Sequence, residues 1–165
     1  MKFQENKIVI HSGGQTGVDR AALDFAICNG MSCTGWCAQD RKAEDGIINI
    51  RYPLRPVFSF DPDLRTELNV SDCDGTLIIL LNEMDRGTRI TNDWAKIYRK
   101  PTFIYTSDDH KKVTDQKFKR WLTANKINHL NVAGPRESNS PGIYNFALEV
   151  LTGLFLEKTV SFDFK

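Results

Sequence analysis

Short apolar runs alternate with segments of helical periodicity along the chain. Five runs are typical of β-strands, and the run GTLIILL is apolar at nearly every position, which indicates a strand buried on both faces. The expected strands cover residues 7–11, 31–36, 75–81, 102–106 and 129–133.

The segments between these runs have the spacing and boundary residues of helices. Thr16 and Asp19 form a T-x-x-D capping pair before the first helix, and Gly30 ends it. A second helix is expected over 63–73, and a third has Ile90, Trp94, Ile97 and Tyr98 on one face. A fourth includes Phe118, Trp121 and Leu122, and a fifth follows a Ser140-Pro141 cap.

Two segments fall outside this alternation. Residues 37–62 are polar and contain Pro53, Pro56 and Pro62, so we expect an extended excursion without regular structure. The tail places Val160, Phe162 and Phe164 at alternate positions, as in an edge strand or a contact between subunits.

Strands that alternate with helices predict right-handed crossovers and a mostly parallel sheet. We therefore expect an α/β fold, a Rossmann-like doubly wound sheet with helices on both faces. The length of 165 residues suits a single domain over 1–165.

Composition narrows the classes of partner. The net charge of +1 gives no electrostatic reason to expect nucleic acid, and no apolar run is long enough to cross a membrane. The polar N-terminus lacks the apolar region of a signal peptide, so we expect a cytoplasmic protein. Its four cysteines then stay reduced, most simply as buried thiols, and their spacing matches no standard zinc site.

Polar loops follow the predicted strands where a doubly wound sheet binds its ligands, at the carboxyl ends. The loop after the first strand contains Gly13, Gly14, Gln15 and Thr16. Glycine amides approach an anion closely, and a helix N-terminus favours negative charge, so this loop either binds phosphate or is only a tight turn. Its spacing differs from G-x-G-x-x-G and from a P-loop, and no acidic residue closes the predicted second strand to hold a ribose.

Three further loops and one helix offer candidate ligands. Each has a simpler interpretation as a helix cap, a solvated loop or a local ion pair: Arg65 could bind a phosphate, or could pair with Asp63 or Glu67. The candidates are Arg41, Glu44 and Asp45, then Gly87 and Thr88, then Arg136 and Glu137, and Arg65. No histidine has a partnered nucleophile in the sequence, so we assign no catalytic residue.

Several motifs in the same order resemble the molybdenum carrier proteins, also described as molybdenum cofactor carriers. They are SGGQTGVDRAALDFAI (12–27), GWC with R-x-AEDG (35–46), YPL (52–54), RTELNVSDCDGTLI (65–78), GT-x-x-T (87–91), KP (100–101), LNVAGPRES and PGIY (130–144). The resemblance implies a Rossmann-like fold related to the lysine-decarboxylase-like proteins and the cytokinin-activating phosphoribohydrolases. It also implies molybdenum cofactor (molybdopterin) as a ligand.

The chain departs from the family pattern at two predicted rim loops, residues 37–41 and 81–87. Related hydrolases carry a catalytic glutamate in GT-x-x-E, where this chain has Thr91, which cannot act as a carboxylate base. The sequence therefore favours a binding protein over an enzyme.

Three functions follow as hypotheses. The first is a carrier of a phosphate-bearing pterin or nucleotide-like molecule, most simply a homo-oligomer because of the Phe162/Phe164 tail. The second is a nucleotide-processing N-glycoside hydrolase that uses Glu44, Asp45 or Glu137 as its base. The third is a nucleotide-sensing domain.

Overall fold

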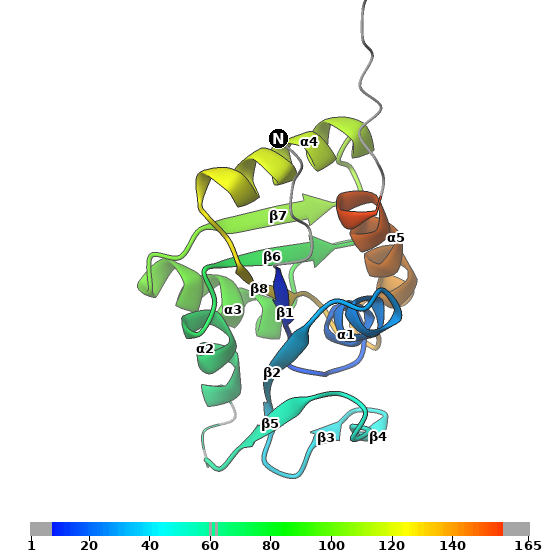
Figure 1. Cartoon of the computed structure of the whole chain (residues 1–165). Helices are drawn as coiled ribbons and strands as arrows, with labels where there is room; N and C mark the ends of the chain where they lie inside the picture. The colour runs from blue at the N-terminus through cyan, green and yellow to red at the C-terminus, as the bar shows by residue number, and fades with distance from the viewer. Residues whose placement is uncertain (1–7, 60, 62, 157–165) are drawn as a thin grey trace, which may run out of the picture.

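The computed structural model describes residues 8–59, 61 and 63–156. A six-stranded sheet runs through the centre of the molecule in the order β5-β2-β1-β8-β6-β7 (Figure 1), and every neighbouring pair in it is parallel. The strands are β1 Val9–His11, β2 Cys33–Ala38, β5 Leu54–Val57, β6 Gly75–Leu80, β7 Thr102–Thr106 and β8 His129–Ala133.

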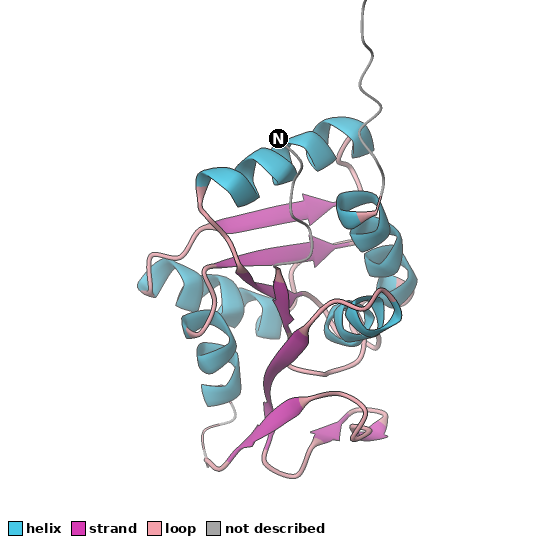
Figure 2. Ribbon diagram, in the orientation of Figure 1, coloured by secondary structure: helices cyan, strands magenta, loops and turns pink. Residues whose placement is uncertain are grey.

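Helices cover both faces of this sheet (Figure 2). On one face α1 and α4 both contact α5, while α2 and α3 contact each other on the opposite face. The helices are α1 Val18–Cys28, α2 Leu64–Ser71, α3 Arg86–Ile97, α4 Lys111–Ala124 and α5 Ile143–Phe155. The prediction of a Rossmann-like doubly wound α/β fold is confirmed.

The expectation of no regular structure over 37–62 is wrong. This segment forms an antiparallel hairpin of β3 Lys42–Ala43 and β4 Gly46–Ile47, followed by the edge strand β5. Pro56 lies inside β5, where a missing N–H costs little because β5 pairs with β2 alone. Strand β2 also continues to Ala38, two residues beyond the predicted end.

Two predicted helix caps are also wrong. Helix α1 begins at Val18 after Gly17, without a side-chain cap, because the Thr16 hydroxyl bonds to Glu44 instead. Helix α5 begins at Ile143 after Gly142, whose left-handed backbone makes the turn that Ser140-Pro141 was expected to make.

The main core lies between the sheet and helices α1, α4 and α5, and it includes Ile10, Leu77, Phe118 and Leu151. Helix α3 does not bury mainly the apolar face that the sequence predicted, which contains Ile97. Thr88, Thr91 and Ala95 are buried, whereas Ile97 is 64% exposed. On the face of the sheet beneath α2 and α3, Asn131 and its hydrogen-bond partner Thr76 are buried polar side chains.

The last strand, β8, lies in the middle of the sheet between β1 and β6. The chain leaves β8 for α5 on one face and leaves β6 for α3 on the other, which makes this the switch point of the topology. Ligands of doubly wound sheets bind in the crevice at such a point.

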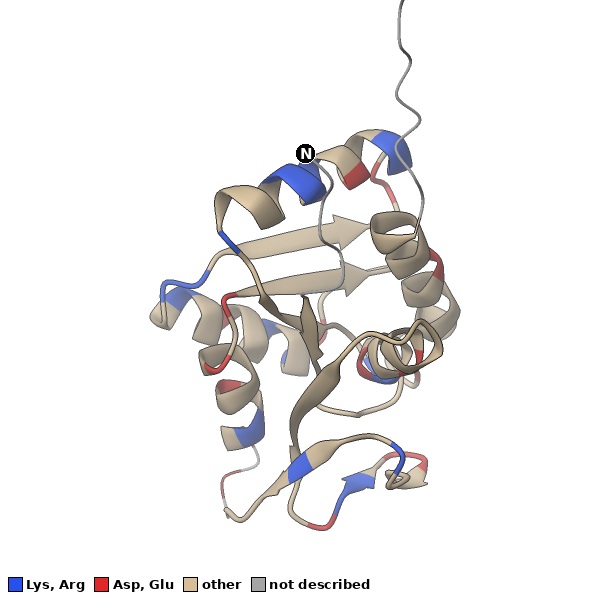
Figure 3. Cartoon of the chain, viewed as in Figure 1, with Lys and Arg blue, Asp and Glu red and all other residues tan. Residues whose placement is uncertain are grey.

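Charged residues of both signs are spread along the helices and loops (Figure 3). Within the described ranges no helix is both long and apolar enough to cross a membrane. Cys37 and Cys73 are buried thiols as expected, but Cys28 is exposed and Cys33 is half-buried. The Phe162/Phe164 tail lies outside the described residues.

A buried histidine, His11, contacts the exposed His129 of the neighbouring central strand. His11 Nε2 lies 2.9 Å from His129 Nδ1, and His11 Nδ1 has no partner among the described residues. Burial, with the nearby His129, lowers the pKa of His11 to about 4. Since the unfolded chain binds this proton more tightly, the fold loses stability as the pH falls from about 6.5 towards 4.

Replacing this histidine should remove that loss. As the pH is lowered from 7 to 4, the free energy of unfolding of the wild type should fall relative to that of His11→Gln. We expect this relative change to be about 2–3 kcal/mol. Urea unfolding of both proteins across this range measures it, with His110→Gln as a control at an exposed position. A difference that does not change with pH would contradict the assignment.

Candidate functional site

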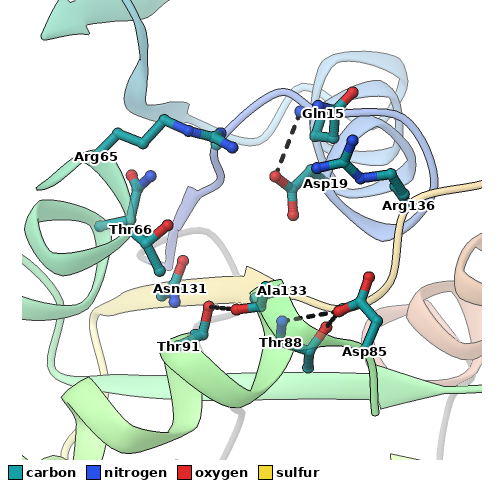
Figure 4. Close-up of a pocket in the computed structure, with 14 residues that line it drawn as sticks. Gln15, Asp19, Arg65, Thr66, Asp85, Thr88, Thr91, Asn131, Ala133 and Arg136 are labelled. Atoms are coloured by element: carbon teal, nitrogen blue, oxygen red, sulfur yellow. Dashed lines mark hydrogen bonds between the residues drawn. The ribbon is translucent and has the colours of Figure 1, made fainter. Parts of the chain in front are cut away.

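A small cavity of about 70 Å³ opens at the carboxyl ends of β1, β6 and β8. Side chains from the loops after these strands and from α2 surround it (Figure 4). Six predicted site residues line it: Gly13, Gln15, Arg65, Gly87, Thr88 and Arg136. The others, Gly14, Thr16, Arg41, Glu44, Asp45 and Glu137, lie outside its lining.

Two guanidinium groups, of Arg65 and Arg136, reach the cavity from opposite sides (Figure 4). Arg65 forms no hydrogen bond or ion pair with any residue that the structure describes. The acids expected as its alternative partners are engaged elsewhere, since Asp63 pairs with Arg86 and Glu67 accepts a hydrogen bond from Tyr98. In the structure Arg65 pairs with neither of these acids.

Asn69 explains how Arg65 reaches the cavity. Its side-chain amide exchanges two hydrogen bonds of 2.9 Å with the main chain of Trp36, which holds α2 against β2. Arg65 lies one turn earlier on the same face of α2. A lone asparagine in a short helix gives no sign of this role in the sequence.

The glycine loop meets the cavity in only two places, at Gly13 and Gln15. Some of its main-chain N–H groups are engaged within the protein: Gln15 donates to Asp19 and Thr16 to the Gln15 side chain, while Val18, the first residue of α1, donates to Pro135. Fewer amides therefore remain for an anion than the sequence predicted.

Gly14 faces away from the cavity and towards apolar side chains. Its φ is 77°, and a Cβ there would lie 2.4 Å from Leu54 Cδ1. Gly14 is therefore required by the packing of the loop. Its carbonyl oxygen accepts hydrogen bonds from Arg20.

Asp19 lines the cavity, although the sequence predicted for it only a role in a helix cap. Burial raises its pKa to about 6, against the opposing effect of nearby Arg65. A Cβ on Gly13 would lie 2.8 Å from Asp19 Oδ2 and 3.2 Å from Arg65 Nη1, so the carboxylate and the guanidinium flank the same glycine. A carboxyl group with this pKa exchanges protons readily near neutral pH.

The floor of the cavity is built by the first turn of α3. Asp85 Oδ1 accepts hydrogen bonds from Thr88 N (2.8 Å) and Thr88 Oγ1 (2.6 Å). Although burial alone would raise the pKa of Asp85, bonds from Thr88 and Asn139 lower it below its usual value. The Thr88 hydroxyl thus serves the helix cap, and Thr91 lines the cavity with its hydroxyl donating to Gly87 O.

Glu44 connects three loops beside the cavity. Its carboxylate accepts hydrogen bonds from Thr16 Oγ1, Ser138 N and Ser138 Oγ, and pairs with Arg136 at 3.7 Å. Partial burial opposes them, but these hydrogen bonds lower the pKa of Glu44. The hairpin residue therefore fixes Arg136 at the rim.

The remaining candidates hold the chain together. Arg41 donates to four main-chain carbonyl oxygens, of Ile48, Asn49, Tyr52 and Leu54. Asp45 pairs with Arg20 at 3.0 Å. Glu137 accepts hydrogen bonds from Gly142 N and Tyr144 N at the start of α5. Their polar groups are thus engaged within the protein.

A second, larger hollow of about 540 Å³ adjoins the first. It lies at the ends of β2 and β5, and Arg65 lines both spaces. Its other described lining residues are Ala38, Gln39, Asp40, Val57, Ser59 and Asp61. In the described part of the chain, no group of three or more His, Cys, Asp or Glu residues is arranged to hold a metal ion.

Replacing Asp19 should stabilise the protein at neutral pH. The raised pKa means that ionised Asp19 disfavours folding, at a cost that is absent below about pH 4 and complete above about pH 6. We expect Asp19→Asn to gain about 2 kcal/mol in unfolding free energy relative to the wild type over this range. Denaturant unfolding at pH 4 and pH 7.5 tests this, and an unchanged difference would refute the burial of a charge.

Comparison with known proteins places this architecture in a family. Residues 10–155 match the model of the Circularly permutated YpsA SLOG family. The crystal structure of a putative molybdenum carrier protein from Syntrophus aciditrophicus SB superposes with a TM-score of 0.86 at 38% identity, covering 92% of this chain and 97% of that one. A search of curated proteins finds no match. The chain belongs to the Circularly permutated YpsA SLOG family.

Proposed function

We propose that the protein binds a phosphate-bearing small molecule at the cavity between β1, β6 and β8. The observation that carries this proposal is Arg65, a half-buried guanidinium that faces the cavity, lies near Asp19, and forms no hydrogen bond or ion pair with any described residue. Unpaired guanidinium groups are well suited to phosphate, because their planar donors bind two of its oxygens. Arg136 and Gln15 add donors from the opposite wall.

Molybdenum cofactor is the candidate that the family resemblance supplies. The similar protein from Syntrophus aciditrophicus carries the name of a molybdenum carrier. Molybdopterin has a phosphate, which Arg65, Arg136 and Gly13 would hold, while a cavity of about 70 Å³ leaves the pterin outside it. Its chemistry in a carrier would be delivery of the intact cofactor, with no covalent step at this site.

Charge balance makes Asp19 a regulator of this binding. Two arginines and the two carboxylates of Asp19 and Asp85 line the cavity. With Asp19 ionised these charges cancel, whereas with Asp19 protonated the cavity carries a net positive charge. An anion should therefore bind more tightly as the pH falls through about 6, because burial places the pKa of Asp19 there.

A second candidate function, hydrolysis of an N-glycosidic bond, is favoured by the same residue. Related hydrolases have a catalytic glutamate where this chain has Thr91, and Asp19 would supply a carboxylate at the cavity in its place. It would take a proton from water as the water oxygen attacks the anomeric carbon. The carbon–nitrogen bond then breaks, its electron pair leaves with the base, and Asp19 returns to the leaving nitrogen the proton that it took from water.

Removing the unpaired guanidinium tests the binding proposal. We expect Arg65→Gln to bind inorganic phosphate and molybdopterin about 10- to 100-fold more weakly than the wild type, because a charged hydrogen bond is lost. Calorimetry or an NMR titration measures the affinities. Arg89→Gln removes the same charge from an exposed position outside the cavity lining and should bind normally. Equal loss in both variants would refute a specific site.

Asp19→Asn separates the two functions. In a binding protein the substitution removes a negative charge, so phosphate should bind roughly 3- to 10-fold more tightly at pH 7.5. In a hydrolase it removes the base, so release of base from a panel of nucleoside monophosphates should fall about 10²- to 10⁴-fold. Absence of turnover by the wild type would exclude the hydrolase for that panel.

A further inference from the structure

Strand β7 forms one free edge of the sheet. It pairs with β6 alone and lies at the margin of the sheet beside α4 (Figure 1). Its sequence, TFIYT, has no charged residue and no proline, whereas the opposite edge strand, β5, contains both Arg55 and Pro56. Charges and prolines on an edge strand oppose its pairing with a further strand. The edge of β7 lacks this protection, so it can accept another strand.

The register of β7 shows which main-chain groups of this edge are available. Successive residues of a strand turn their N–H and C=O groups to opposite sides. Ser107 N donates to a carbonyl oxygen of β6, so the odd-numbered residues of β7 bond to β6, and the groups of Thr102 and Ile104 point outwards. Thr106 also points outwards, but Asp109 engages both its N–H and its C=O. Thr102 and Ile104 thus offer four polar groups to a further strand.

One face of β7 is also uncovered. Phe103 contacts Phe118 and Trp121, so α4 covers the face of β7 that carries the odd-numbered side chains. Ile104 points to the other face and is 42% exposed. Side chains that oppose each other in an antiparallel pair lie on the same face. A strand that places apolar residues opposite Ile104 would therefore bury it.

The carboxyl-terminal segment, residues 157–165, has the sequence that this edge requires. It lies outside the described residues and reads EKTVSFDFK. Val160, Phe162 and Phe164 alternate with polar residues, as in a strand with one apolar and one polar face. Residues 160–164 also equal β7 in length.

The position of α5 determines the direction in which this segment could pair. Helix α5 ends at Phe155, and its last turn lies beside the first residue of α4, since a Cβ on Gly153 would lie 2.9 Å from Lys111 Cε. Helix α4 itself follows the carboxyl end of β7. Nine extended residues span roughly 30 Å, against about 17 Å for a five-residue strand. A segment that starts here and follows β7 runs towards its amino end, antiparallel to it.

Charge distinguishes this segment from a second copy of β7 as the occupant of the edge. Helix α4, which flanks β7, has no exposed acidic residue. Its exposed basic residues include Lys112, Lys117 and Arg120. Two copies that paired through β7 would bring two basic helices together, which is unfavourable. The tail instead places Asp163 on the side of α4 when Phe162 opposes Ile104.

We propose that residues 160–164 of the chain pair with its own β7 as a seventh, antiparallel strand, with Phe162 opposite Ile104. The main chains of Phe162 and Phe164 then bond to the four outward groups of Ile104 and Thr102, and the apolar side chains of the tail cover Ile104. The tail closes the edge against other chains. This role is separate from the ligand site.

Pairs of cysteines test the register. In a chain with Cys28→Ser, which removes the exposed native thiol, Ile104→Cys/Phe162→Cys is compared with the control Ile104→Cys/Ser161→Cys. Opposed residues have Cβ atoms roughly 4.5–5.5 Å apart, close enough for a disulfide after a small adjustment, whereas residue 161 points to the other face. Mild oxidation should remove both introduced thiols of the first pair in a species that migrates as a monomer. The introduced thiols of the control should stay free.

Hydrogen exchange tests the same contact without new thiols. NMR measures the exchange rate of Ile104 N–H in the wild type, in Phe162→Ser/Phe164→Ser, and in Phe58→Ser, which changes an exposed phenylalanine outside the tail. We expect exchange about tenfold faster in the tail variant, because the hydrogen bond to Ile104 is then open more often. The Phe58 control should exchange at the wild-type rate.

Three results would overturn the proposal. The first is that the thiols at positions 104 and 162 stay free after oxidation. The second is an exchange rate at Ile104 that is the same in the tail variant and the wild type. The third is a covalent dimer as the main oxidised product, which would assign the edge to the tail of a second copy.

Discussion

A close main-chain contact between the loop after β1 and the loop after β8 holds the carboxyl edge of the sheet together. At Gly17 a Cβ would lie 2.3 Å from Pro135 O, and Val18 N donates a hydrogen bond to this same oxygen. The loop after β1 and the loop after β8 can meet this closely only because residue 17 has no side chain and adopts a φ of 77°. The same approach brings Thr16 to Glu137 N and leaves Arg136 beside the cavity.

Much of the fold could be predicted because its strands are short apolar runs separated by helical patterns. The hairpin and β5 could not, since strands of two residues carry no periodicity and Pro56 is typical of a loop. The buried face of α3 was also hidden. Thr88, Thr91 and Ala95 are the buried residues of that helix, whereas Ile97 and Tyr98 of its more apolar face are exposed.

The general position of the site followed from the rule that ligands bind at strand ends, and this rule led to Gly13, Gln15, Gly87, Thr88 and Arg136, while Arg65 was a candidate on a predicted helix. The use of each side chain depends on tertiary contacts that the sequence does not reveal. Arg41 and Glu137 form hydrogen bonds with nearby main-chain groups. Asp19 is instead buried beside the cavity, and this burial raises its pKa.

The pairing of β1 with β8 in the centre of the sheet also affects how the protein can be made. During synthesis the glycine loop emerges first, but the strand beside it and Arg136 come from the last quarter of the described chain. A ribosome-bound chain that lacks these residues exposes one edge of β1 and cannot complete the cavity. Contacts this distant in sequence also slow folding, so chaperones would encounter a chain whose ligand site forms after the rest has been synthesised.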